Sequence, residues 1–314
     1  MSLPAIRSDP DEHDFVRIGA GSFGAIYVPS GRQGAIKVAH KVEDSEIVKQ
    51  EFNALEELFA LCERDSLFQF PRPIAYHNPM IPESVVSHLF FSGIQHGRRQ
   101  SGFDPADYLS GLDVQSAVYI MDRLPILPNK PAHRIRQLFF PEKSDAHPKL
   151  LRLYFGKVFP PPSEKASKFF NSANFPLDVA RYNTFKEGID APSAEEIASG
   201  MGALLSLIHW RAGYDARDIE FVLSGDGWSG LAFYAIDFNQ MRKWGMTGET
   251  VQVLVDAHYL NDPYYPRARA SDPLYQVFKH AYLSACSLVD AAREAADTFF
   301  DLIEREQARR DEPA

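Results

Sequence analysis

The most constraining feature of this chain is a glycine-rich turn near its start, Gly19-Ala20-Gly21-Ser22-Phe23-Gly24. It lies within residues 14–38, whose alternation of apolar and polar residues predicts two or three strands in a hairpin arrangement. Glycine lets the backbone approach a phosphate closely and aim amide hydrogens at it. Hairpin turns also collect glycine, so a purely structural turn is the alternative. The candidate phosphate-binding residues are Gly19, Gly21, Ser22 and Gly24.

A lysine follows on the next predicted strand, in Ala35-Ile36-Lys37-Val38. A lysine within an apolar strand is costly to bury unless an anion meets it. Glu51 lies on a predicted helix over residues 45–63, on the same face as Val48, so it should point inward. The turn and this strand together resemble the N-terminal lobe of protein kinases. The resemblance implies that Lys37 and Glu51 pair to position phosphates. A buried ion pair without a ligand is the alternative.

A second set of candidate residues follows a predicted helix that begins at the capping box Ser193–Glu196 and ends at Gly213. The loop after this helix resembles the kinase catalytic loop H-R-D-L-x-x-x-N, and Tyr234–Asn239 resembles the strand that leads into D-F-G. The spacing implies one role for each matching position. Asp215 takes the place of the catalytic aspartate, Arg217 that of the phosphate-contacting lysine, Glu220 that of the metal-binding asparagine, and Asp237 that of the magnesium ligand.

This loop departs from the kinase pattern in four ways. It begins Gly-Tyr-Asp, Glu220 replaces asparagine, Asn239 replaces glycine, and no A-P-E follows. The candidate catalytic residues Asp215, Asp218, Glu220 and Asp237 would form an acidic cluster, which cannot stay fully ionised without a cation. Magnesium on Asp237 and Glu220 is one candidate cation, and a guanidinium is another. Asp218 as a plain surface residue of the loop is the alternative.

The order of predicted elements favours an α+β, protein-kinase-like bilobal fold, with a small β-rich N-lobe at 1–124 and a mainly helical C-lobe at 125–314. Residues 129–192 are expected to form an irregular basic insertion. Between Asn129 and Glu187 there are 11 Lys or Arg and 5 Asp or Glu, a local charge of +6 in a chain of −9. This surplus indicates a local phosphate site, with a merely solvated insertion as the alternative.

Composition excludes several classes of protein. The two cysteines, Cys62 and Cys286, provide neither a disulfide framework nor the spacing of a zinc site. No apolar run reaches the roughly 18 residues of a membrane span, and no signal peptide is visible. The sequence therefore predicts a cytoplasmic protein without a membrane partner. The net negative charge argues against DNA binding.

A narrower resemblance rests on five segments: Arg152–Lys157, His209–Gly213, Asp215–Leu223, Ile236–Asn239 and Asn261–Pro266. They resemble a fungal family of kinase-like proteins, sometimes labelled zinc finger, that is similar to the fungal arginine-containing cyclodipeptide synthases. Such enzymes join arginine to a second amino acid as a cyclo(Arg-Xaa) diketopiperazine. Their partners are arginyl-tRNA and a second aminoacyl-tRNA.

This resemblance implies that no ATP or metal is required, because an aminoacyl ester is already activated. The acidic cluster would hold the arginyl guanidinium, and the basic segment would hold the tRNA. Asp215 would be the general base. Ser22 is a possible acyl acceptor, or a plain loop residue. Two other functions stay open: an atypical phosphotransferase that uses Mg and ATP, and a non-catalytic kinase-like binding module.

Overall fold

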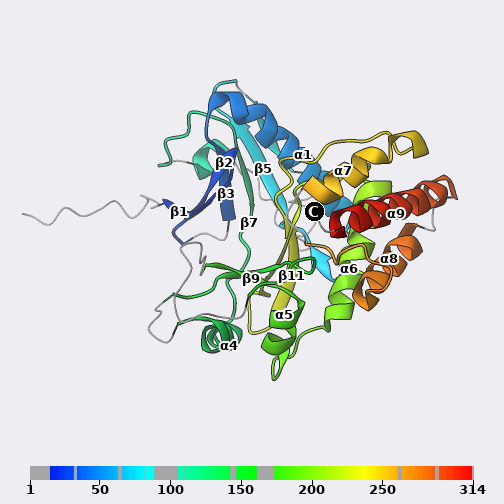
Figure 1. Ribbon diagram of the computed structural model, residues 1–314. Coiled ribbons are helices and arrows are strands. Elements are labelled where there is room, and N and C mark those ends of the chain that lie inside the picture. The colour runs from blue at the N-terminus through cyan, green and yellow to red at the C-terminus, as the bar shows by residue number, and fades with distance from the viewer. Residues whose placement is uncertain are drawn as a thin grey trace, which may run out of the picture. The chain divides into compact units, whose positions relative to one another are not determined.

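The computed structural model describes most of the chain, and Figure 1 shows its elements in chain order. By contact, the chain divides into two compact units, residues 1–56 with 71–123 and residues 57–70 with 124–314. Each unit contains a β-sheet and helices, so the predicted α+β class is confirmed. The described residues are 15–31, 34–62, 66–81, 83–87, 105–109, 111–141, 146–160, 173–260, 264–286 and 290–312.

The first unit is built on a six-stranded sheet in the order β1-β2-β3-β7-β5-β6. Every neighbouring pair in this sheet is antiparallel. Its strands are β1 (Phe15–Ala20), β2 (Gly24–Pro29), β3 (Gly34–Ala39), β5 (Pro73–Asn78), β6 (Glu83–Val86) and β7 (Val118–Asp122). The hairpin arrangement predicted for residues 14–38 is thus confirmed.

Helices of the first unit are η1 (Val42–Asp44), α1 (Ser45–Leu61), whose last residues from Glu57 fall in the second unit, and α3 (Pro105–Tyr108). α1 forms as predicted, and its residues Val48, Phe52 and Leu55 are almost fully buried. They recur at helical spacing, so one face of the helix is apolar and is removed from water.

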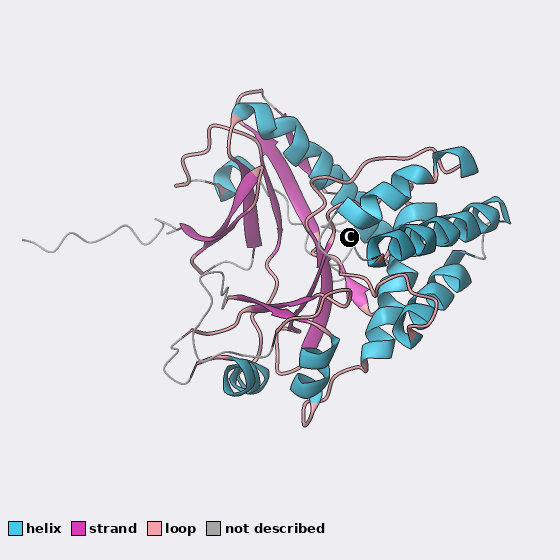
Figure 2. Ribbon diagram, viewed as in Figure 1, coloured by secondary structure: helices cyan, strands magenta, loops and turns pink. Residues whose placement is uncertain are grey.

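The second unit contains a five-stranded sheet in the order β4-β11-β10-β8-β9. Figure 2, in which strands are magenta, shows its strands among the helices of this unit. Two pairs are parallel, β4 with β11 and β8 with β9. The strands are β4 (Phe68–Gln69), β8 (Leu150–Leu153), β9 (Asn174–Leu177), β10 (Glu220–Gly225) and β11 (Leu231–Ile236).

This sheet corrects one expectation from sequence. The second unit contains more helix than strand, as expected, but the described part of residues 129–192 is not irregular. It contains α4 (Asn129–Phe139), β8, β9 and α5 (Val179–Lys186), and β8 pairs directly with β10. The sequence did not predict β8 and β9 because each is only four residues long, which is too short for a clear alternation of apolar and polar residues.

The other described elements of the second unit are helices. α6 (Ala194–Ser206) begins at the predicted capping box, in which the Glu196 amide donates to Ser193 Oγ at 3.1 Å. Its residues Ile197, Met201 and Leu204 are buried, and it packs on α8 beside α9 (Figure 1). The remaining helices are η2 (Leu207–Arg211, a π-helical turn), η3 (Gly248–Thr250), α7 (Gln252–Leu260), α8 (Pro273–Cys286) and α9 (Asp290–Asp311).

No helix in the described residues is both long enough and apolar enough to cross a bilayer.

Candidate functional site

The glycine-rich turn joins β1 to β2 within the first unit. The Gly21 amide donates to the Gly24 carbonyl at 2.9 Å, and the imidazole of His40 hydrogen-bonds the Gly21 carbonyl at 3.0 Å. A Cβ at Gly24 would lie 2.7 Å from the Val38 carbonyl oxygen, so close packing of β2 on β3 requires that glycine. A Cβ at Gly21 would meet no atom within 4 Å. The fold therefore explains Gly24 but does not itself require glycine at position 21.

Lys37 and Glu51 form the predicted pair. Lys37 Nζ lies 2.7 Å from Glu51 Oε1, and both side chains are buried. The Tyr119 hydroxyl donates to the same oxygen at 3.0 Å. β3 and α1 hold the two charges together in the apolar interior, which offsets the cost of burying either one alone. The pairing is confirmed, whereas its role in binding phosphates stays a prediction.

The acidic cluster lies in the second unit, at one end of the β10–β11 hairpin. Glu220 begins β10 opposite Ile236, the last residue of β11, and Asp237 follows directly. The charges of Asp237 and Asp218 both act on Glu220. Three of the four predicted carboxylates are therefore brought together, and Asp218 is part of the cluster.

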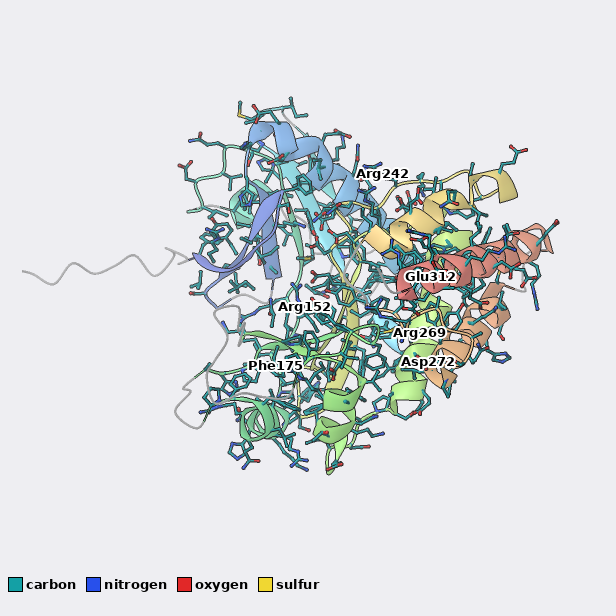
Figure 3. All side chains as sticks on the ribbon, viewed as in Figure 1. Arg152, Phe175, Arg242, Arg269, Asp272 and Glu312 are labelled. Carbon is teal, nitrogen blue, oxygen red and sulfur yellow. The ribbon has the colours of Figure 1, made fainter. Side chains whose placement is uncertain are left out.

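The carboxyl group of Glu220 has a raised pKa. Burial, followed by the charges of Asp237 and Asp218, raises its pKa to about 7, against the opposing effects of Arg152 and a hydrogen bond with Tyr264. Arg152, labelled in Figure 3, comes from β8 and places Nη1 2.8 Å from Glu220 Oε1. Burial opposes the charge of Arg152, but Glu220 and the two tyrosines around it raise the pKa of the guanidinium overall.

The ion pair alone would favour an ionised Glu220, whereas burial among like charges favours the protonated form. Burial, together with the charges of Asp237 and Asp218, outweighs the ion pair and raises the pKa of Glu220.

Residues in and beside the acidic cluster also have an unusual, left-handed backbone conformation. Ala216, Asp218 and Asp237 have positive φ values of 53°, 64° and 66°. The left-handed region is unfavourable for residues other than glycine and persists only where surrounding contacts enforce it. The side-chain amide of Asn239 donates to Asp237, and the side-chain amide of Gln240 donates to Asp218. A local contact thus holds Asp237, and a contact from the loop after β11 holds Asp218.

Asp215 has a different environment. It is buried, and its Oδ1 accepts hydrogen bonds from the backbone amides of Arg217 at 3.1 Å and Arg242 at 2.9 Å. Burial raises the pKa of its carboxyl group, and these amides oppose the shift. Asp215 therefore orders the loop that carries Asp218 and Glu220. Arg217, predicted to contact phosphate, has its backbone amide on Asp215 and its Nε buried without a hydrogen-bond partner among the described residues.

A buried histidine that sequence reasoning missed fixes the Asp215 loop. His209, in the π-helical turn η2, hydrogen-bonds the backbone of Asp215 and places Nδ1 2.7 Å from the Tyr282 hydroxyl. The backbone of Asp215 accepts from the ring, so Nε2 of the neutral imidazole carries the proton. Nδ1 then accepts from the Tyr282 hydroxyl, which in turn accepts from the Trp210 indole at 2.8 Å. Burial lowers the pKa of His209 to about 3, so the ring is neutral.

Arg152 and Tyr264, which both contact Glu220, lie within segments on which the family resemblance rests. No local signal marked them as site residues. Only the pairing of β8 with β10 shows that Arg152 faces Glu220.

One comparison with known proteins finds a match. A family described as "Zinc finger protein" matches residues 233–294, about a fifth of the chain. The expected zinc-finger label is thereby confirmed, while the match does not bear on a kinase-like or synthase relationship. No curated protein matches the chain.

The residues of the matched segment do not fit a zinc ion. Its one cysteine, Cys286, is buried, and burial raises the pKa of the thiol to about 11. His258 stacks on Tyr265, with ring centroids 5.1 Å apart. In the part of the chain that the structure describes, no group of three or more His, Cys, Asp or Glu side chains is arranged to hold a metal ion.

Glu220 Oε1 contacts the guanidinium of Arg152, and Asp237 Oδ1 accepts a hydrogen bond from the side-chain amide of Asn239. Each carboxylate has a second oxygen, so these contacts do not decide whether a metal ion binds. Magnesium on Glu220 and Asp237 stays a prediction.

Proposed function

We propose that this chain is an aminoacyl-tRNA-dependent cyclodipeptide synthase that joins arginine to a second amino acid. The observation that carries the proposal is the cluster of Asp218, Glu220 and Asp237, in which Glu220 holds the guanidinium of Arg152. Carboxylates match the planar fork of donors of a guanidinium. The ion pair of Glu220 with Arg152 supports the view that this site suits an arginine side chain.

The chemistry requires a base and an activated acyl group. The amine of one aminoacyl-tRNA attacks the ester carbonyl of the other, a C–N bond forms, and the C–O bond to the ribose breaks. The amine proton passes to Glu220 and then to the departing ribose oxygen. Repeating the attack within the dipeptidyl ester closes the ring. ATP and redox chemistry are not needed.

Glu220 is better suited to the proton transfer than Asp215. A general base works best with a pKa near the working pH, and burial brings the pKa of Glu220 to about 7. In this proposal Asp215, expected as the base, orders the loop through its two backbone hydrogen bonds. Ser22 is exposed in the glycine-rich turn, and an acyl-enzyme on its hydroxyl stays a prediction.

The test is product formation. Expression in a bacterial host fed labelled arginine should yield a cyclic dipeptide that contains the label, detected by mass spectrometry of the medium. Purified protein should make the same product from charged tRNA without ATP. Glu220→Gln should reduce the rate about 100-fold or more, in the range of general-base catalysis. Asp301→Asn, at an exposed position on α9, is the matched control. Failure of the folded protein to make dipeptide from arginyl-tRNA would contradict the proposal.

A phosphotransferase is the second candidate, favoured by the buried Lys37–Glu51 pair on the strand after the glycine-rich turn. In that case Mg-ATP should raise the melting temperature of the protein, and Lys37→Met should abolish the rise. A binding module without chemistry would show neither product nor phosphoryl transfer.

A further inference from the structure

The far end of the β10–β11 hairpin presents an unusual side chain. Trp228, in the turn between the two strands, is 91% exposed. The turn itself is well ordered: Asp226 Oδ1 accepts hydrogen bonds from the amides of Trp228 at 2.8 Å and Gly230 at 3.0 Å. A large aromatic ring is therefore held in solvent by a defined turn, and packing within the unit does not explain it.

The segment that precedes α4 lies against this turn. The Gly225 amide and the Ser224 hydroxyl both donate to the Pro125 carbonyl, at 3.3 and 2.8 Å. A Cβ at Gly225 would collide with the Ile126 carbonyl oxygen, so glycine is needed for this close approach. Ile126 is itself 55% exposed. The contacts fix the hairpin turn next to the start of α4.

Basic residues lie on the elements next to this turn. α4 carries Lys130, His133, Arg134 and Arg136 and no acidic residue. Lys149 lies beside the segment of Ile126, because its carbonyl accepts a hydrogen bond from the Leu127 amide at 3.0 Å. Lys130 and Lys149 are both exposed. The nearest acid in the turn, Asp226, has Oδ1 directed at the amides of its own turn.

We propose that this hairpin-tip surface, formed by Trp228, Ile126, Lys130 and Lys149, binds the unpaired end of a transfer RNA. Aromatic rings stack on exposed bases whatever their sequence, and lysines beside them neutralise the backbone phosphates. A protein partner would use the tryptophan and isoleucine but has no need for a helix with only basic charges.

The position of the surface suits the proposed reaction, on which this inference rests. The acidic cluster is at the opposite end of the same hairpin, whose strands have six residues each. At about 3.3 Å per residue the two ends are roughly 20 Å apart. A short single strand bound at Trp228 could therefore extend along the hairpin and bring its esterified end to Glu220.

Tryptophan fluorescence tests the proposal directly. The other two tryptophans, Trp210 and Trp244, are 5% and 8% exposed, so Trp228 dominates the solvent-accessible emission. Uncharged transfer RNA should quench this emission and protect it from iodide. By anisotropy with labelled transfer RNA, Trp228→Ala should weaken binding about 5- to 100-fold, as expected for the loss of one stacked base. Val158→Ala, at another exposed apolar position, should have no effect.

The salt dependence tests the lysines. Lys130→Glu with Lys149→Glu should reduce the slope of log K against log salt by about 1.4, since each phosphate contact to a single strand contributes about 0.7. Arg305→Glu, at an exposed position on α9, is the control. Unchanged affinity in both the tryptophan and the lysine variants would overturn the proposal. Protection of Trp228 by self-association rather than by RNA would also overturn it.

These outcomes separate the inference from the proposed function. If transfer RNA binds through Trp228 but no dipeptide forms, the RNA-binding proposal is supported and the synthase proposal is wrong. If dipeptide forms and the KM for charged tRNA is unchanged in the Trp228→Ala and lysine variants, the synthase proposal is supported and the RNA-binding proposal is wrong.

Discussion

At the scale of single residues, the two units differ in the surroundings of one buried ionisable side chain each, Lys37 in the first unit and Glu220 in the second. Lys37 forms an ion pair with Glu51 in the first unit, while Glu220 pairs with Arg152 and also feels the charges of Asp218 and Asp237 in the second. Several carboxylates in one site favour a cation near them. The proposed function therefore assigns the cationic substrate to the second unit.

The stability of the protein should depend on Glu220 with a defined sign. Its pKa is about 7 when folded and near 4.5 when unfolded, so its contribution is complete below pH 4.5 and is lost as pH rises to 7. Glu220→Gln cannot ionise, so its stability relative to wild type should increase from pH 5 to pH 8, by about 1.4 kcal/mol per unit of pKa shift at most. Urea unfolding at both pH values measures this, with Glu249→Gln at an exposed position as the control. A difference independent of pH would contradict it.

The ion pair in the first unit should show the cost of an unmatched charge. Lys37→Met leaves Glu51 buried without its cation and should lower the free energy of unfolding by about 3–5 kcal/mol. The double variant Lys37→Met with Glu51→Gln should recover part of that loss, because neither charge remains. Chemical denaturation of the three proteins gives the result. Equal losses in single and double variants would mean that packing, not charge, dominates.

At the scale of elements, short backbone distances decide how the helices of the second unit pack. A Cβ at Gly202 would collide with the Phe278 carbonyl oxygen, so α6 and α8 come together at a glycine. This contact positions Tyr282 of α8 beside His209, which in turn holds the Asp215 loop. Helix packing is thereby linked to the candidate site.

Gly202→Ala should therefore destabilise the protein despite the better helix propensity of alanine. Overpacking a close contact costs about 1–3 kcal/mol, more than the gain of up to about 1 kcal/mol from replacing glycine within a helix. The melting temperature should fall, and Tyr282 should move relative to His209. Gly248→Ala, where a Cβ would meet no atom within 4 Å, is the control. A more stable Gly202→Ala protein would show that the helices can separate without loss.

At the scale of the whole molecule, charge and metal content are the informative properties. The chain has a formal charge of −9, yet the segment with α4, β8, β9 and α5 is basic. This segment belongs to the sheet that carries the acidic cluster, so opposite charges are concentrated within one unit.

The zinc-finger label of the matched family leads to a prediction about metal. The two cysteines lie far apart in the sequence and Cys286 is buried, so we expect that folding does not depend on zinc. Dialysis against a strong chelator should leave the melting temperature unchanged, and elemental analysis of the purified protein should find less than one zinc per chain. Stoichiometric zinc with unfolding upon chelation would contradict this reading.

Much of the fold could be predicted because its signals are local. The glycine-rich turn, the Lys37 strand, the Glu51 helix face and the capping box at Ser193 each depend on residues close in sequence, and each forms as expected. The predicted carboxylates also gather, except that Asp215 is occupied by backbone amides. These features follow from the short-range spacing of helices, turns and strands.

Only the tertiary structure decided which residues complete the site. Arg152 reaches Glu220 because β8 pairs with β10, and His209 reaches Asp215 because a π-helical turn and α8 place it there. The sequence by itself determined the local elements and the residue types that carry charge. It could not determine which distant charges meet, because strand register and helix packing are set by the free energy of the whole core rather than by any single segment.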